Sequence, residues 1–176
     1  MSEQKIYHVA IRKIGKLVTL EPFSHNRLRE FYRLYQKTSE SWEEFLFLGF
    51  NDGYDVREFI NQRFTNPLFT GFFIVVDRKV VGFILGECDE VDDKIVMITY
   101  AVAKEFENKG YASEAIQMFE ELLKDADFSV ILSGCTSDNV KSKHLMEKSG
   151  YQYLETRTMQ FVFDKVDMDY YFKVLS

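Results

Sequence analysis

Apolar and polar residues follow the clearest pattern on either side of a turn centred on Gly110. The stretch before the turn, residues 98–103, is strand-like, with Tyr100 and Val102 as its β-forming residues. After the turn, apolar residues recur at spacings of three and four: Ala112, Ala115, Ile116, Phe119, Leu122 and Leu123. This spacing predicts an amphipathic helix with one buried face, joined to the preceding strand by a tight turn.

The N-terminal third of the chain predicts one strand and two helices. Residues 16–20 are expected to form the first strand, and a helix is expected to open near Pro22 and to continue to about Gln36. The aromatic-rich residues 38–54 are interpreted as core and lid packing. A second helix is predicted over residues 56–64.

The middle of the chain has the pattern of an antiparallel meander. Three strands, separated by a tight turn and an acidic loop, are expected over residues 72–76, 80–87 and 94–102. The last of these strands leads directly into the turn at Gly110. The meander therefore predicts a sheet that presents this turn at the end of a strand.

The C-terminal part predicts a strand, a helix and a final set of strands. The short apolar run at residues 128–132 is typical of a strand buried on both faces. Asp138 or Ser137 is expected to cap a helix that ends at Gly150. Further strands are expected near residues 151–156, 159–163 and 168–175.

The composition narrows the class of protein. A chain of 176 residues with 46% hydrophobic and 28% charged residues is typical of one soluble globular domain. The net charge of −6 gives a nucleic-acid partner no electrostatic support and slightly favours a cationic substrate. Cys88 and Cys135 are too few for a disulfide framework and lack metal-ligand spacing, so we expect a reducing compartment and no metal.

The sequence contains no segment typical of membrane insertion or export. No apolar run approaches the roughly 18 residues that a membrane span needs, and the first residues lack the apolar core of a signal peptide. We therefore expect a cytoplasmic protein with no membrane partner.

The turn at Gly110 has the chemistry of an anion site. A helix start leaves about four backbone N–H groups without internal partners and carries roughly half a positive charge, so a loop that wraps onto it holds a phosphate without any lysine. Gly110 lacks the Cβ that would keep a ligand oxygen away, and the small side chain of Ala112 leaves room for the ligand next to it. By itself, such a turn is more often an ordinary connection, so a functional interpretation needs a second signal.

The second signal is the segment N-V-K-S-K-H-L-M-E-K-S-G-Y at residues 139–151. Together with the turn, it resembles the GNAT family of N-acetyltransferases. The family's acyl-CoA loop reads roughly Gln/Arg-x-x-Gly-x-Gly/Ala, and its later helix reads Asn-x-x-Ser/Ala-x-x-Leu-x-x-x-x-Gly-Phe/Tyr. The match covers residues 104–151 in the family's order and spacing, and the flanking segments resemble the branch that acetylates ribosomal-protein N-termini.

The resemblance implies a fold, a reaction and a cofactor. The expected fold class is α/β, a GNAT-like single domain over residues 1–176 with a mixed, mostly antiparallel sheet and helices on both faces. The expected reaction is N-acetylation, in which an acceptor amine attacks acetyl-CoA directly in a ternary complex. No metal takes part.

The resemblance also implies where acetyl-CoA binds. Tyr100, Ala101 and Val102 are expected to pair with the pantetheine amides and to direct one N–H at the oxyanion. Asn139 and Ser142 share a helix face and are expected to meet the pantetheine further along. The pyrophosphate is expected on Glu107, Asn108, Lys109, Gly110, Tyr111, Ala112 and Ser113. An ordinary sheet strand is the open alternative for the first group.

Two positions depart from the family. Glu107 stands where the family usually has Gln or Arg, and because a carboxylate near a pyrophosphate is repulsive, its side chain is expected to point to solvent. Met146 stands where many members have the Tyr commonly assigned to protonate the leaving thiolate. Releasing a thiolate of pKa near 8.5 at pH 7 costs only about 2 kcal/mol more than releasing the thiol, which one hydroxyl or an ordered water can supply, and Ser142 is the predicted thiol partner. A polar helix spacer is its alternative interpretation.

No residue is an obvious general base. The candidates are Glu87, Asp89 and Glu90 at the end of the meander, for which a solvated loop charge is the alternative interpretation, and Thr99 and Tyr100 are candidates for ordering a water relay. Cys135 invites an acyl-enzyme mechanism, but the three histidines give it no convincing partner. A lysine amine costs roughly 4–5 kcal/mol to deprotonate at pH 7, against about 1 for a peptide α-amine, so a site without a strong base favours the α-amine.

Two other function classes stay open. A non-catalytic acyl-CoA-binding or sensing module is suggested by Glu107, Met146 and the missing base. An acetyltransferase of a small cationic metabolite, such as a polyamine or an aminoglycoside, is suggested by the acidic balance. The identity of the acceptor and a homodimeric partner are also left open.

Overall fold

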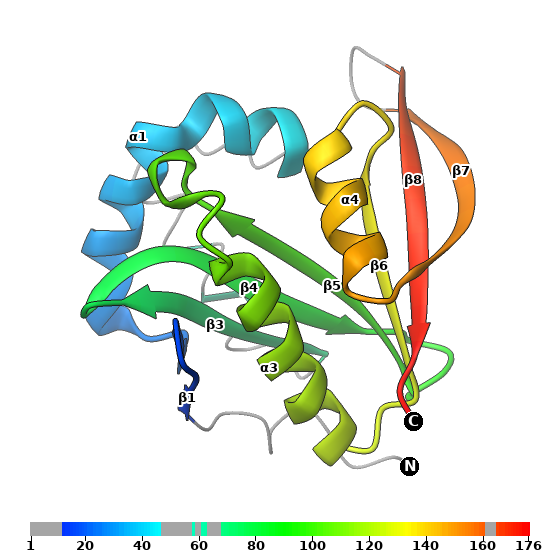
Figure 1. Cartoon of the computed structure of the whole chain (residues 1–176), viewed down its shortest axis with the longest axis horizontal. Coiled ribbons are helices and arrows are strands. Elements are labelled where there is room, and N and C mark those ends of the chain that lie inside the picture. Colours follow the sequence, from blue (N-terminus) through cyan, green and yellow to red (C-terminus); the bar gives the residue numbers. More distant parts are fainter. Residues whose placement is uncertain (1–11, 47–57, 59–60, 63–67, 161–164) are drawn as a thin grey trace.

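The computed structural model describes residues 12–46, 58, 61–62, 68–160 and 165–176 (Figure 1). The described strands form one eight-stranded sheet in the order β1-β2-β3-β4-β5-β6-β8-β7. Their bounds are β1 Lys13–Ile14, β2 Thr19–Pro22, β3 Phe69–Val76, β4 Lys79–Cys88, β5 Ile95–Val102, β6 Val130–Thr136, β7 Gln152–Gln160 and β8 Lys165–Val174. The helices of the described residues are α1 Leu28–Leu46, α3 Tyr111–Asp125 and α4 Val140–Lys148, with short 3-10 turns η2 His25–Arg27 and η3 Lys104–Phe106.

The sheet is mixed and mostly antiparallel, as predicted. Every neighbouring pair of described strands is antiparallel except β5 and β6, which are parallel. A parallel pair needs a crossover connection, and α3 supplies it. The crossover places the start of α3 directly after the end of β5.

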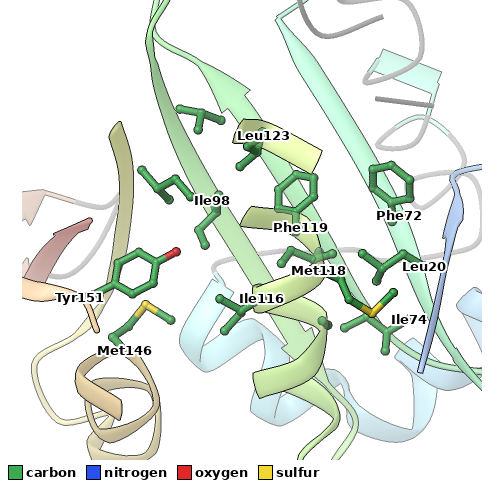
Figure 2. Packing of buried hydrophobic residues seen from close by; sticks show 14 of the residues in the cluster. Leu20, Phe72, Ile74, Ile98, Ile116, Met118, Phe119, Leu123, Met146 and Tyr151 are labelled. Carbon is green, nitrogen blue, oxygen red and sulfur yellow. The ribbon is translucent and has the colours of Figure 1, made fainter. Parts of the chain in front are cut away.

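Two apolar layers lie on opposite faces of the sheet. In β3, Phe72 and Ile74 belong to the cluster that packs under α3 and α4, whereas Phe73 and Val75 belong to the cluster that packs under α1. This division follows from the strand period of two, which sends successive side chains to opposite faces. Figure 2 shows the first cluster, with Phe119 of α3 over the sheet. The predicted helices on both faces are therefore confirmed.

The N-terminal elements differ from the prediction in their bounds. The strand predicted at residues 16–20 is displaced, because Gly15 and Val18 close a turn through a 2.8 Å backbone hydrogen bond and β2 begins only at Thr19. Helix α1 runs ten residues past the predicted end at Gln36, since no Gly or Pro interrupts it before Leu46. The rest of the predicted lid segment, residues 47–54, lies outside the described residues.

The second predicted helix can be compared only in part. Residues 58, 61 and 62 of the predicted helix at 56–64 are helical, and its other residues lie outside the described part of the chain.

The C-terminal elements also correct the prediction. The two strands predicted at 151–156 and 159–163 are one strand as far as Gln160, because no turn residue separates them; residues 161–163 lie outside the described part. The strand β6 begins two residues later than predicted and alternates between buried and half-buried positions. It is therefore covered on one face, not on both.

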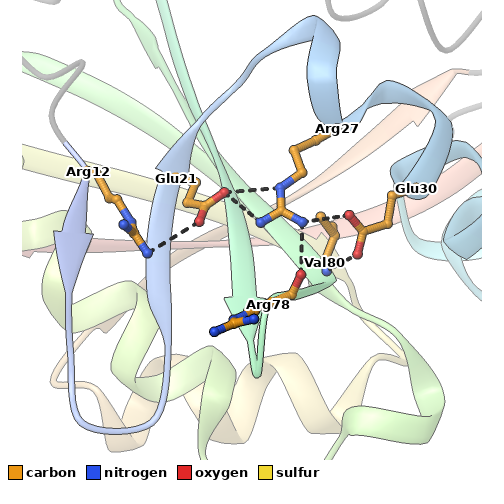
Figure 3. Close-up of polar contacts among 6 residues, drawn as sticks. All are labelled: Arg12, Glu21, Arg27, Glu30, Arg78 and Val80. Carbon is orange, nitrogen blue, oxygen red and sulfur yellow. Dashed lines mark hydrogen bonds and ion pairs between the residues drawn. The ribbon is translucent and has the colours of Figure 1, made fainter.

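A polar cluster fixes the start of α1 (Figure 3). The Arg27 guanidinium donates to Glu21 at 3.0 and 3.1 Å, to Glu30 at 2.7 Å and to the carbonyl of Arg78 at 2.9 Å. Glu30 in turn accepts from the backbone N–H of Val80 at 2.8 Å. The bond to Glu30, together with Glu21, raises the pKa of Arg27. The cluster ties α1 to β2 and to the β3–β4 turn.

Candidate active site

The strands β5 and β6 part within the sheet (Figure 1). Their parallel ladder joins Ile95–Ile98 to residues 130–133 and goes no further. At the point of divergence, the Ser133 hydroxyl donates to the carbonyl of Ile98 at 3.4 Å. Within the described residues, the β6 side of residues 99–102 therefore has no strand partner. An edge of this kind pairs with the amides of an extended ligand.

A cavity of about 700 Å³ occupies the space opened by the divergence. It is lined by the end of β5, the turn before α3, the end of β6 and the start of α4. Of the predicted site residues, those that line it are Tyr100, Ala101, Val102, Glu107, Asn108, Gly110, Tyr111, Ala112, Ser113, Asn139 and Ser142. Segments far apart in the sequence thus meet in one place.

Gly110 is the N-cap of α3 and has left-handed backbone torsions, with φ 80°. It offers no side chain to the first-turn N–H groups, which leaves them available to an anion at the positive end of the helix. A Cβ built on Gly110 would lie 3.3 Å from Leu17 Cδ1. The loop around Gly110 therefore lies between the cavity and the β1–β2 turn.

Glu114 holds the β1–β2 turn against the start of α3. Its carboxylate accepts hydrogen bonds from the backbone N–H groups of Lys16 at 3.0 Å, Leu17 at 2.6 Å and Val18 at 2.7 Å. The sequence analysis did not identify this contact, because it joins residues almost a hundred positions apart with no motif at either end. It fixes the first turn of α3 behind the cavity.

Two charged residues of the loop lie differently from the expectation. The Glu107 carboxylate forms an ion pair with the Lys141 ammonium at 2.6 Å, instead of only facing solvent. The Lys109 ammonium lies over the Phe106 ring, 5.3 Å from its centroid, and Lys109 is not among the cavity-lining residues. The two lysines therefore have separate local partners.

Asn139 is the N-cap of α4, in place of the predicted Asp138 or Ser137. Its Oδ1 accepts from the backbone N–H of Ser142 at 3.1 Å. This bond leaves the amide NH2 group of Asn139 as the donor for a ligand.

The hydroxyls of Tyr100 and Ser142 are 2.8 Å apart and share a hydrogen bond. Burial raises the pKa of Tyr100, so its phenol stays protonated at neutral pH. Cys135 lies beside this pair, and burial raises the pKa of its thiol too. The sequence analysis assigned separate tasks to Tyr100 and Ser142 and did not foresee that they touch. The contact depends on the divergence of β5 and β6, which leaves no local signal.

Met146 is 1% exposed and packs in the core beside Tyr151 (Figure 2). Its side chain therefore does not reach the cavity. A tyrosine hydroxyl lies instead on β5, where Tyr100 contacts Ser142 of this helix.

Asp169 of β8 anchors the start of α4, and the sequence analysis missed it. The carboxylate is 5% exposed, accepts from Ser137 Oγ at 2.6 Å and Thr156 Oγ1 at 2.7 Å, and pairs with Lys143 Nζ at 2.6 Å. Burial alone would raise its pKa, but the bonds from Lys143, Ser137 and Thr156 lower the pKa of Asp169 to about 2. The carboxylate thus joins the β6–α4 turn to β7 and β8.

Glu87 does not line the cavity. Its side chain is exposed on β4, opposite Met97 in the ladder and two residues along β4 from Leu85, the partner of Thr99. Because Met97 and Thr99 share a sheet face, Glu87 lies on the same face as the cavity-lining Thr99. Its role as a base remains a prediction.

Two further searches cover only the part of the chain that the structure describes. Within it, no group of three or more His, Cys, Asp or Glu residues is arranged to hold a metal ion. None of the described helices is both long enough and apolar enough to cross a membrane.

The sequence was compared with known families and proteins. The model of the Acetyltransferase (GNAT) family matches residues 20–151, well over half of the chain. The chain belongs to the GNAT acetyltransferase family. The family and the enzyme class predicted from the sequence are confirmed by this match. The comparison with curated proteins found no match.

Solved structures show the same GNAT fold at low sequence identity. An acetyltransferase from Salmonella typhimurium that modifies the N-terminal serine of ribosomal protein L7/L12 has a TM-score of 0.84 and 13% identity, over 93% of this chain and 98% of that chain. RimL, a ribosomal L7/L12 α-N-protein acetyltransferase in a disulfide complex with coenzyme A, has a TM-score of 0.83 and 13% identity, over 93% and 97%. The microcin C7 self-immunity acetyltransferase MccE, with acetyl-CoA and AMP, has a TM-score of 0.81 and 21% identity, over 91% and 93%.

Proposed function

We propose that this GNAT protein transfers an acetyl group from acetyl-CoA to a primary amine by direct attack, with a protein N-terminal α-amine as its preferred acceptor. The observation that carries the proposal is the divergence of β5 and β6 next to the uncapped start of α3. One open strand edge and one helix N-terminus meet in a single cavity, which suits a ligand with an extended amide arm and a pyrophosphate.

The residues present fit such a donor. Residues 100–102 would supply backbone groups for the pantetheine amides, and Asn139, whose NH2 group is left as a donor, lines the same cavity. The first-turn N–H groups of α3, which begins after Gly110, would hold the pyrophosphate. When bound, acetyl-CoA supplies an activated thioester.

The hydroxyl pair of Tyr100 and Ser142 is placed to protonate the departing sulfur. The amine nitrogen bonds to the acetyl carbon, the carbon–sulfur bond breaks, and the thiolate takes a proton from one of the two hydroxyls. The pair is half-buried and already hydrogen-bonded, so it needs little reorganisation as charge develops. A pair of hydroxyls in the lining of the cavity favours catalysis over the alternative of a non-catalytic acyl-CoA sensor.

Ser142→Ala is expected to lower kcat about tenfold or more, with little change in acetyl-CoA affinity, because the interaction strengthens only as charge develops on sulfur. Tyr100→Phe should have a similar effect. The fold decrease in kcat of the double variant should be smaller than the product of the two single decreases, because the hydroxyls act as one unit. Steady-state CoA release with a thiol reagent measures all three.

The neighbouring Cys135→Ala is the matched control and is expected to keep normal turnover. A folded but inactive Cys135→Ala protein, or an isolable acetylated cysteine, would contradict direct attack and support an acyl-enzyme.

The choice of an α-amine rests on two arguments. The GNAT structures named above include enzymes that modify a ribosomal-protein N-terminus. Among the described residues, the carboxylates that line the cavity are Glu107, which is paired with Lys141, and Asp138, next to the N-cap of α4; neither is the predicted base, and a site without a strong base suits an amine with an accessible neutral fraction. The net charge of −6 keeps a small cationic metabolite as the second candidate acceptor.

At pH 7, a peptide α-amine is expected to react roughly three hundredfold faster than a lysine side chain, since pKa values of about 7.8 and 10.4 give neutral fractions that differ by that factor. CoA release is measured against peptide α-amines, lysine peptides, polyamines and aminoglycosides from about pH 6 to 9. The rate on each amine should climb with pH. If Glu87 is the base, Glu87→Gln depresses kcat at neutral pH and is partly rescued at high pH.

A flat profile for both amine types, with chemistry shown to be rate-limiting, would contradict control by amine deprotonation. Faster turnover of polyamines than of any peptide would replace the proposed acceptor with the second candidate.

A further inference from the structure

The ion pair between Glu107 and Lys141 connects two walls of the cavity. Glu107 belongs to the loop before α3 and Lys141 to the first turn of α4, so the pair joins the two walls that part after Ile98. Both residues line the cavity, and their charged atoms are 2.6 Å apart. A donor that lies between the two walls would therefore lie close to this ion pair.

The bridge is built to exchange. The Lys141 side chain is 72% exposed and the Glu107 side chain is 30% exposed. Water therefore screens the attraction between the two charges, and the ion pair is weak. The nearby α3 start is the place proposed for the pyrophosphate. A phosphate there is a more highly charged partner for the Lys141 ammonium than one carboxylate, and the ammonium binds it as a mobile point charge.

Glu107 has the opposite relation to the same ligand. It competes with a phosphate for Lys141, and it adds a negative charge beside the phosphate once the ligand is bound. Both effects weaken binding of a phosphorylated donor, and neither acts on a donor fragment without phosphate.

We propose that Glu107 and Lys141 form an exchangeable latch, in which Lys141 leaves Glu107 for a phosphate of the acyl-CoA and Glu107 thereby limits the affinity for the donor. The inference rests on the proposed function. It assigns Lys141 as a phosphate-binding residue and Glu107 as the residue that makes donor release easier.

The test measures binding of CoA and of pantetheine, which carries no phosphate, by calorimetry at low ionic strength. Glu107→Gln is expected to bind CoA about three- to fivefold more tightly, the range that an exposed ion pair supports. Lys141→Met is expected to bind CoA about fivefold more weakly. Pantetheine affinity should be the same in all variants. Glu105→Gln, an exposed residue that does not line the cavity, is the matched control and should leave CoA affinity within twofold.

The double variant separates exchange from simple repulsion. If Lys141 must leave Glu107, the gain from Glu107→Gln is larger in the presence of Lys141 than in the Lys141→Met background. Equal gains in both backgrounds, or no gain at all, would overturn the latch while leaving CoA binding intact. A wild-type protein that binds neither CoA nor pantetheine would overturn the proposed function and this inference with it.

Discussion

Gly110→Val is expected to abolish the thermal stabilisation that CoA gives to the wild-type protein. A ligand at a hundred times its Kd stabilises the folded state by about 2.7 kcal/mol, so the wild-type melting temperature should rise by several degrees. The variant loses this response for two reasons. Its Cβ meets the Leu17 side chain, 3.3 Å away, and a branched residue resists the left-handed torsions of position 110, so both effects displace the turn that presents the first-turn N–H groups of α3.

Gly150→Val is the matched control for this experiment. Gly150 also has a positive φ, 84°, but it follows the end of α4 and does not line the cavity. Both variants should lose about 1–2 kcal/mol or more of folding free energy from the strained backbone, and only Gly150→Val should keep the CoA response. Gly110→Ala replaces Gly110→Val if the latter does not fold. Equal stabilisation of the wild type and the Gly110 variant by CoA would refute the phosphate-loop assignment.

Asp169→Ala is expected to lower the free energy of unfolding by about 3 kcal/mol, because it removes one partner of a largely buried ion pair and the acceptor that Lys143, Ser137 and Thr156 share. Urea unfolding at pH 7 measures the loss. Asp167→Ala is the control on the same strand and face: Asp167 is exposed and accepts from Thr158 at 2.6 Å, so its loss should cost less than about 1 kcal/mol. Similar losses in the two variants would show that Asp169 is not an anchor.

The anchor should also depend on pH. The folded-state pKa of Asp169 is about 2, below its ordinary value of 3.8, so its contribution is present above about pH 4 and is lost as the pH falls toward 2. The shift corresponds to about 2 kcal/mol. The stability difference between wild type and Asp169→Asn should therefore shrink over this interval. A stability difference that stays constant down to pH 2 would mean that these contacts do not lower the pKa of Asp169.

The sequence predicted the parts of the site that are local. The turn at Gly110 and the segment at 139–151 are short motifs whose chemistry is set by neighbouring residues, and the structure brings them to one cavity. The helix face shared by Asn139 and Ser142 follows from the helical period alone. Their roles in binding acetyl-CoA remain predictions.

Contacts between distant segments were not predictable in the same way. The contacts of Tyr100 with Ser142 and of Asp169 with Lys143 depend on how distant strands and helices are arranged in the fold. These polar residues belong to no local sequence pattern that would predict the contacts. The sequence also placed a break within β7 that does not exist, because hydrogen bonds to β8 hold the strand together across its polar residues.

The short ladder between β5 and β6 has a further consequence for affinity. The ladder ends at Ile98, but the apolar cluster below it is continuous from β3 through α3 to Tyr171 of β8. The two walls of the cavity are thus locked by the core and not by the ladder. The cleft is preorganised, so a donor need not separate strands to enter it. Little of the interaction free energy is then spent on ordering the protein, and most of it can appear as affinity.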